Sequence, residues 1–211
     1  MRTEELIAAL ADGTTPVRRH AVERRVLSGL VAGVAVTMML VGVRGLRPDL
    51  PGAMMTGPFL MNGGYAVALT SIAVLAVLQA ARPDRAPRAL QWAIVPLLAM
   101  AVLAAIELGT APFGQWRDLV MGRNSWHCTV EVALLSLPLF GGLLWAFRAM
   151  APVRLRLAGA ALGLAAGAGA TALHILHCTE QTAAFMLSWH TLAIGLAVAT
   201  GALAGPRLLR W

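Results

Sequence analysis

The chain has 211 residues, of which 58% are hydrophobic and only 13% are charged, and its formal net charge is +7. Soluble globular proteins carry about 25% charged residues, so this composition excludes an ordinary water-soluble domain. The excess of basic residues does not indicate nucleic-acid binding, because all 17 are arginines and most lie in short stretches between long apolar runs. Two cysteines are too few for a disulfide framework and allow one bridge or one thiolate site.

The first 25 residues form the only sizeable segment outside the apolar runs. Thr3 can cap a short helix on which Leu6, Ile7 and Leu10 share one face. A helix of this length is not stable alone in water. It is therefore expected either to fold on a partner protein or to rest its apolar face on a membrane. The polar and acidic start predicts no cleavable signal peptide, so the first apolar run is expected to stay in the membrane.

Six later runs each approach the ~20 apolar residues that a helix needs to cross a bilayer. The sequence therefore predicts an all-α integral membrane bundle of six transmembrane helices over residues 26–211, following the short segment 1–25. The predicted spans are roughly Val26–Val43, Phe59–Ala81, Ala89–Leu108, Thr129–Phe147, Leu157–Leu176 and Ala183–Gly205.

The distribution of arginines predicts that both chain ends lie in the cytoplasm, because positive charge is retained on the cytoplasmic side of membranes. Most arginines then fall in the N-terminal segment, in the second and fourth connections and at the C-terminus. The exceptions on the other side are Arg44, Arg47, Arg117 and Arg123. The six spans are expected to lie in contact with membrane lipid.

The fifth predicted span carries Gly159, Gly163 and Gly167 at intervals of four residues. Small residues at this spacing allow two membrane helices to approach closely. We interpret this pattern as a packing seam.

Two short strings carry the residues with the richest chemistry. They are Trp126–Glu131 and His174–Glu180, and each contains His-Cys-Thr. The predicted topology places both at the outer face of the membrane. If the fifth helix continues through the second string, His174 and Cys178 share one of its faces, as His127 and Glu131 do in the fourth helix.

Thiolate and imidazole ligands suit zinc or copper. The sequence therefore indicates a metal or redox site whose sulfur ligands are Cys128 and Cys178; the further candidate ligands are His127, His174, His177 and Glu131. The alternative is that each cysteine is a small buried apolar residue. His190, within the sixth span, is expected to pair with Glu131 or to donate to a backbone carbonyl.

No nucleophile triad, phosphate-binding loop, dinucleotide fingerprint or Cys-x-x-Cys is present. The sequence therefore predicts no enzyme, although a small redox or haem-binding membrane enzyme remains the alternative function.

Over nearly its full length the chain resembles the NrsF-like integral-membrane anti-sigma factors. The resemblance is carried by the opening 3–11 and 16–19, by Trp126-His127-Cys128, and by later motifs. These later motifs are Leu173-His174, Cys178-Thr179-Glu180, Ala184-Phe185, Trp189-His190 and the closing residues 205–211.

The resemblance implies that the protein lies in the inner membrane of a bacterium. It also implies that the protein holds an extracytoplasmic-function (ECF) sigma factor at the inner face and binds no nucleic acid directly. It also implies release of the sigma factor when Cys128 and Cys178 sense metal or oxidative stress outside the membrane. The expected sigma-binding residues lie in the N-terminal segment: Leu6, Ile7, Leu10, Pro16 and Val17.

Overall fold

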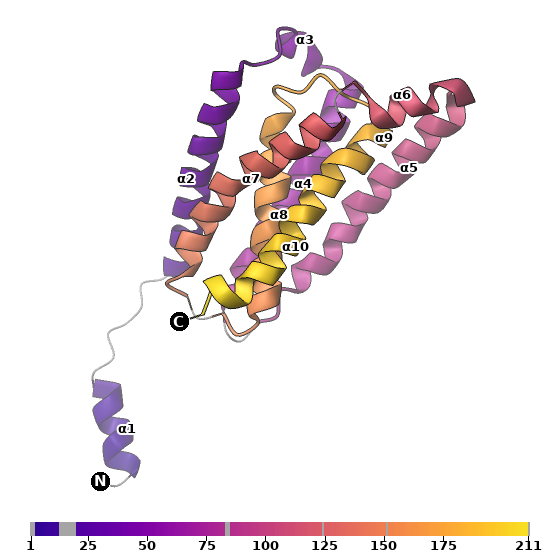
Figure 1. The fold of residues 1–211 in the computed structure, drawn as a ribbon. Helices are drawn as coiled ribbons and strands as arrows, with labels where there is room; N and C mark the ends of the chain where they lie inside the picture. Colours follow the sequence, from indigo (N-terminus) through magenta and orange to yellow (C-terminus); the bar gives the residue numbers. More distant parts are fainter. Residues whose placement is uncertain (1–2, 13–19, 83–84, 124, 151, 211) are drawn as a thin grey trace.

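The computed structural model describes residues 3–12, 20–82, 85–123, 125–150 and 152–210 (Figure 1). All regular elements in these ranges are helical, and six stretches are long and apolar enough to cross a membrane. The predicted all-α class and the predicted number of long apolar helices are therefore confirmed.

The long stretches are α2 (Ala21–Arg44), α4 (Gly57–Ala80), η1 with α5 (Arg88–Ala93 and Ile94–Thr110), α7 (Ser125–Phe147), α8 (Leu155–His174), and the continuous helix formed by α9 (Ala183–Phe185), η3 (Met186–His190) and α10 (Thr191–Leu208). The shorter elements are α1 (Thr3–Asp12), α3 (Leu50–Ala53), η2 (Phe113–Gln115) and α6 (Trp116–Met121).

Several predicted boundaries differ from those observed, and three of them concern the N-terminal segment and the two cysteine strings. α2 begins at Ala21 instead of Val26, because its polar first turns are stabilised by contacts such as the 2.7 Å ion pair between Glu23 and Arg82 of the α4–η1 connection. α7 begins at Ser125, which brings the first cysteine string into the helix, and α8 ends at His174 instead of continuing to residue 176.

The glycine- and alanine-rich α8 lies in the middle of the bundle (Figure 1). Almost every residue from 158 to 171 is buried, and α8 packs against α4, α7 and α10. α2 packs along α7, and α5 lies at the edge of the bundle against η1, α4 and α9. Small side chains let the central helix accept three close neighbours at once.

The two ends of the bundle differ in what they carry. At the end that we call the upper end, α8 finishes and α3, α6 and α9 gather (Figure 1). At the opposite, lower end, α2 and α8 begin and α10 finishes.

The predicted glycine seam is the contact between α8 and α10. A Cβ atom on Gly163 would collide with the carbonyl oxygen of Ala197, and one on Gly159 would collide with that of Gly201. Gly167 faces Ile194 and Ala197 in the same contact. The two backbones are therefore packed too closely to admit any side chain.

Gly163→Ala is expected to destabilise the bundle, because overpacking a close-packed contact typically costs about 1–3 kcal/mol. Gly195→Ala on α10 is the matched control, since a Cβ there meets nothing within 4 Å. Alanine is the better helix former by up to about 1 kcal/mol, so this control should be neutral or stabilising. Thermal unfolding in detergent measures both, and equal midpoints for the two variants would contradict the close approach.

Candidate functional site

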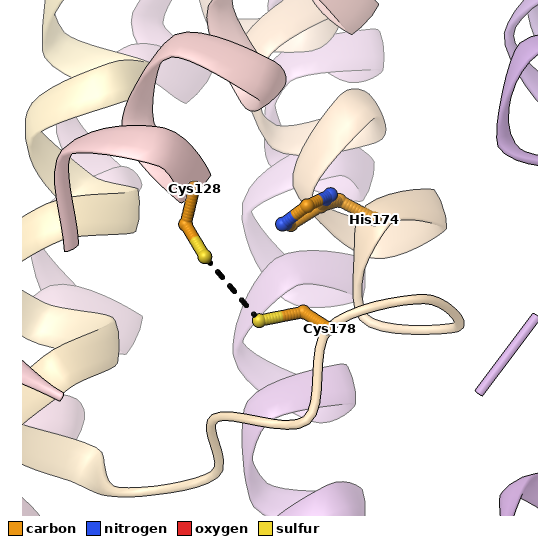
Figure 2. A group of neighbouring side chains, drawn as sticks. All are labelled: Cys128, His174 and Cys178. Atoms are coloured by element: carbon orange, nitrogen blue, oxygen red, sulfur yellow. Dashed lines mark hydrogen bonds between the residues drawn. The ribbon is translucent and has the colours of Figure 1, made fainter. Parts of the chain in front are cut away.

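The two cysteines meet at the upper end of the bundle. Cys128 lies in the first turn of α7, and Cys178 lies in the connection between α8 and α9. Their Sγ atoms are 3.6 Å apart, and each residue is only 6% exposed (Figure 2). Fifty positions separate the cysteines in sequence, so packing of α7 against α8 brings them together.

Cys178 does not continue the helix that carries His174, so the prediction that both residues lie on one helical face was wrong. The helix ends at His174, and the chain turns through Ile175 to His177. The carbonyl oxygen of His174 accepts hydrogen bonds of 2.9 Å from the backbone N–H groups of both His177 and Cys178. This turn keeps Cys178 near His174 after the helix has ended.

Arg47 fixes the position of the Cys178 connection. Its guanidinium is 5% exposed and donates to both carboxylate oxygens of Asp49, at 2.8 and 2.7 Å. Its Nη1 also donates to the carbonyl oxygen of Cys178 at 3.2 Å, and its backbone N–H donates to that of Leu176. With the amide of Gln181 in its better orientation, the side-chain oxygen of Gln181 accepts from the same guanidinium.

Glu131 is a second buried charged group at this end, with a side chain only 8% exposed. Its Oε1 accepts from Arg44 of α2 at 2.9 Å and lies 3.2 Å from Nε2 of His127. Its Oε2 lies 3.8 Å from Nδ1 of His174. The carboxylate therefore links α2, α7 and α8 beside the cysteine pair.

Of the three histidines in the predicted ligand set, His174 alone lies with the sulfurs. His174 is 1% exposed, and one of its ring nitrogens and the two sulfurs lie within 4.8 Å of one another (Figure 2). The side chain of His127 is 71% exposed and faces Glu131. The ring of half-buried His177 contacts the carbonyl oxygen of Gly45 through Nδ1.

His190 is the histidine that the predicted ligand set left out. It ends the π-helical segment η3, is 1% exposed, and its ring centroid lies 5.5 Å from that of His174. Its ring also lies against Phe185, with the ring centroids 5.6 Å apart. Neither ring nitrogen has a hydrogen-bond partner, so the predicted pairing with Glu131 or a backbone carbonyl was wrong.

The environment of Cys178 lowers the pKa of its thiol. The main cause is the hydrogen bond with Cys128, which opposes the effect of burial, and the nearby imidazole of His174 adds to it. A thiolate is the form of cysteine that reacts with oxidants and binds metals. The hydrogen bond between the two sulfurs, in which either can be the donor, therefore favours the reactive form of the pair.

Comparison with known proteins identifies the family. The sequence profile of the family described as negative regulator of sigma F (NrsF) matches residues 10–211. This chain belongs to the NrsF family. It is similar to the probable anti-sigma-F factor NrsF of Azospira oryzae, with 33% identity over the whole of both chains. It is 35% identical to the anti-sigma-F factor NrsF of Caulobacter vibrioides, again over the full length of both. No solved structure matches the chain.

As a member of the NrsF family, the protein is a negative regulator of a sigma factor, and that sigma factor is its binding partner. Anti-sigma factors are regulatory proteins and not enzymes, so the comparisons confirm that the chain is no enzyme and weigh against a redox or haem enzyme.

The residues predicted to bind the sigma factor lie at the start of this NrsF-family chain. Leu6 and Ile7 are 42% and 61% exposed in α1, and Leu10 belongs to the same helix. Pro16 and Val17 lie outside the described residues. Large apolar side chains left in solvent on a short helix are the kind that a partner protein covers.

Sequence reasoning missed Arg47 and His190 as parts of the site. Arg44 and Arg47 were treated only as charges in an outer loop. Both nevertheless lie on the predicted periplasmic side, against the general bias of arginines to the cytoplasmic side. An arginine on that side is a candidate for an ion pair with an acidic side chain. For His190 the available signal was an ionisable residue inside an apolar span, which is a functional candidate by default.

Proposed function

We propose that this protein is an integral-membrane anti-sigma factor that holds an ECF sigma factor at the cytoplasmic face. It releases the sigma factor when Cys128 and Cys178 respond to metal or oxidative stress on the periplasmic side. One observation carries the proposal: a buried pair of sulfurs 3.6 Å apart sits at the end of the bundle opposite the start of α2.

The charges of the two ends support this orientation. The lower end carries the arginine-rich connections α4–η1 and α7–α8 and the end of α10; their arginines are Arg82, Arg85, Arg88, Arg148, Arg154, Arg156, Arg207 and Arg210. Positively charged segments stay in the cytoplasm. The upper end, with the cysteine pair, then faces the periplasm, where conditions allow thiols to be oxidised.

The sigma factor is bound by the N-terminal segment that precedes α2. Leu6 and Ile7 are exposed on α1, and a helix of this size gains its stability from the partner that buries its apolar face. Residues 13–20 join α1 to the first long helix in the sequence, so the position of α2 sets where the segment is tethered.

α7 connects the cysteine pair to that segment. Cys128 lies in its first turn, and its last turn contacts Arg25, near the start of α2. The Arg25 guanidinium donates to the carbonyl oxygen of Ala146 at 3.2 Å and stacks on the Trp145 ring, 5.2 Å from its centroid.

Between these ends, α2 and α7 are in backbone contact. A Cβ on Gly29 would collide with the carbonyl oxygen of Gly142, and one on Gly142 with that of Gly29. Two helices packed this closely move as a rigid pair. A displacement of the upper end of α7 is therefore passed to the start of α2.

The chemistry at the pair supplies such a displacement. A two-electron oxidant converts the two thiols into a disulfide, with loss of two protons and two electrons. The sulfurs must then approach from 3.6 Å to about 2.05 Å. That movement of roughly 1.5 Å draws the first turn of α7 toward the connection after α8.

The topology is tested by reporter fusions and thiol labelling in intact cells. Fusions after Arg88 and Arg156 should report a cytoplasmic location, and fusions near Gly52 and Gln115 a periplasmic one. In intact cells treated with a mild denaturant that loosens the protein without lysing the cells, a membrane-impermeant maleimide should label Cys178. A periplasmic signal after Arg88 would contradict the six-span arrangement.

A further inference from the structure

The geometry points to a zinc site formed by Cys128, Cys178, His174 and His190, buried at the upper end of the bundle. The inference rests on the proposed sensory function of the cysteine pair and names the ligand of that site. It replaces the ligand set suggested by the sequence, since His127 is exposed and faces Glu131, and half-buried His177 contacts the carbonyl oxygen of Gly45.

The spacing of the ligand atoms fits a tetrahedral ion. Thiolates bound to zinc lie about 2.3 Å from the metal, so two of them in a tetrahedral site are roughly 3.8 Å apart. The sulfurs of Cys128 and Cys178 are 3.6 Å apart. One ring nitrogen of His174 and both sulfurs already lie within 4.8 Å of one another, and a bound ion would draw them together by about an ångström.

The hydrogen-bonding environment of the His174 ring is also that expected of a metal ligand. Its Nε2 is buried without a hydrogen-bond partner, while its Nδ1 lies 3.8 Å from Oε2 of Glu131. A carboxylate behind the second ring nitrogen is the usual support of a zinc-bound histidine, because it orients the ring and makes it a better donor. Glu131 is held in turn by its 2.9 Å ion pair with Arg44.

His190 supplies the fourth ligand. Both of its ring nitrogens are buried without partners. The described part of the chain has four buried side-chain N or O atoms in this condition, and three belong to His174 and His190. Unpartnered buried polar atoms are costly and require an explanation such as an ion.

The local backbone and the ligand chemistry agree with this assignment. His190 ends a π-helical turn, a distortion found often at functional sites. On binding, its ring moves toward the sulfurs from its place beside the His174 ring. Two cysteines with two histidines select zinc, which prefers four-coordinate sulfur and nitrogen sites. Binding releases the thiol protons, up to two per ion.

Metal binding by the purified full-length protein in detergent tests the site. After reduction and chelator treatment, Zn²⁺ affinity is measured by competition with a chromophoric chelator, and Co²⁺ is used as a spectroscopic substitute. We expect one Zn²⁺ per chain, and for Co²⁺ the visible bands of a tetrahedral, thiolate-ligated ion. Replacing both cysteines by serine should abolish both signals.

His190→Ala should raise the dissociation constant for Zn²⁺ at least about tenfold, since even partners that only support a ligand are worth roughly 10–100-fold. The matched control is His177→Ala, which removes a nearby half-buried imidazole that contacts the carbonyl oxygen of Gly45; this variant should bind Zn²⁺ as the unmodified chain does. His190→Cys should still hold one Zn²⁺ and should add thiolate-to-Co²⁺ charge-transfer intensity. If His190→Ala does not fold, the His190→Cys variant still tests whether residue 190 is a zinc ligand.

Three results would overturn the site: no stoichiometric Zn²⁺ in the unmodified chain, unchanged affinity in His190→Ala, or loss of Zn²⁺ from a folded His190→Cys variant. Failure of the proposed function has a different signature. A chain that binds Zn²⁺ through all four residues but still releases its sigma factor after cysteine replacement would keep the metal site and refute cysteine sensing. Cysteine-dependent release without zinc binding would refute the metal site alone.

Discussion

Replacing either Cys128 or Cys178 by serine is expected to abolish release of the sigma factor on stress. Serine fills nearly the same buried space, yet it cannot form a disulfide and is a poor ligand for soft metals. Because the two sulfurs contact each other at 3.6 Å, neither cysteine can form the disulfide or the two-sulfur metal site without the other. The double replacement should therefore have the same effect as either single one, as is usual for residues that act as a unit.

The measurement is expression of a sigma-dependent reporter before and after addition of a membrane-impermeant thiol oxidant. Thr129→Ser is the matched control: Thr129 is buried next to Cys128 and donates through its hydroxyl to backbone carbonyls, and serine retains that group. The control should respond normally. A normal response in either single cysteine variant, with protein levels unchanged, would rule out the pair as the sensor.

Leu6→Asp combined with Leu10→Asp is expected to free the sigma factor without any stress signal. The loss of a well-buried leucine typically costs about 2–5 kcal/mol, and every 1.4 kcal/mol is tenfold in affinity. Even the lower figure weakens binding by about thirtyfold. The target genes should then be fully expressed, while the protein still inserts in the membrane.

Ala8→Asp provides the matched control for added charge. Ala8 is exposed in α1 and lies two positions after Leu6, on the opposite face of the helix. Repression should persist in this variant. If the double leucine variant also represses normally, the sigma factor is bound elsewhere, for example by the connection that contains Arg82 and Arg88.

The sequence was sufficient to predict the parts of the fold that depend on local pattern. Apolar runs of membrane-spanning length gave the six long helices, because length and hydropathy are properties of each run alone. The spacing of Gly159, Gly163 and Gly167 predicted a close contact, although the pattern did not identify α10 as the neighbour. The boundaries were less accurate, since polar turns such as Glu23 to Arg25 continue a helix wherever side chains find partners.

The composition of the site could not be predicted in the same way, because it depends on packing between distant elements. The strings around Cys128 and Cys178 drew attention to the right place, but helical spacing gave the wrong relation between His174 and Cys178 once α8 ended. His190 was placed by a π-helical turn, which shifts the helical phase by one residue. The buried contact of Arg47 with the Cys178 connection depends on a loop whose path no periodicity describes.

The central claim is that the state of the cysteine pair controls binding of the sigma factor at the other end of the bundle. The most direct test uses inverted membrane vesicles that contain the full-length protein with its sigma factor bound. Because the cysteine pair then faces the vesicle interior, the vesicles are treated with a membrane-permeant thiol oxidant or reductant and then sedimented. The sigma factor should sediment with reduced vesicles and remain in the supernatant after oxidation, whereas vesicles carrying Cys128→Ser should retain it under both conditions. Equal retention by oxidised and reduced vesicles of the unmodified protein would contradict the account.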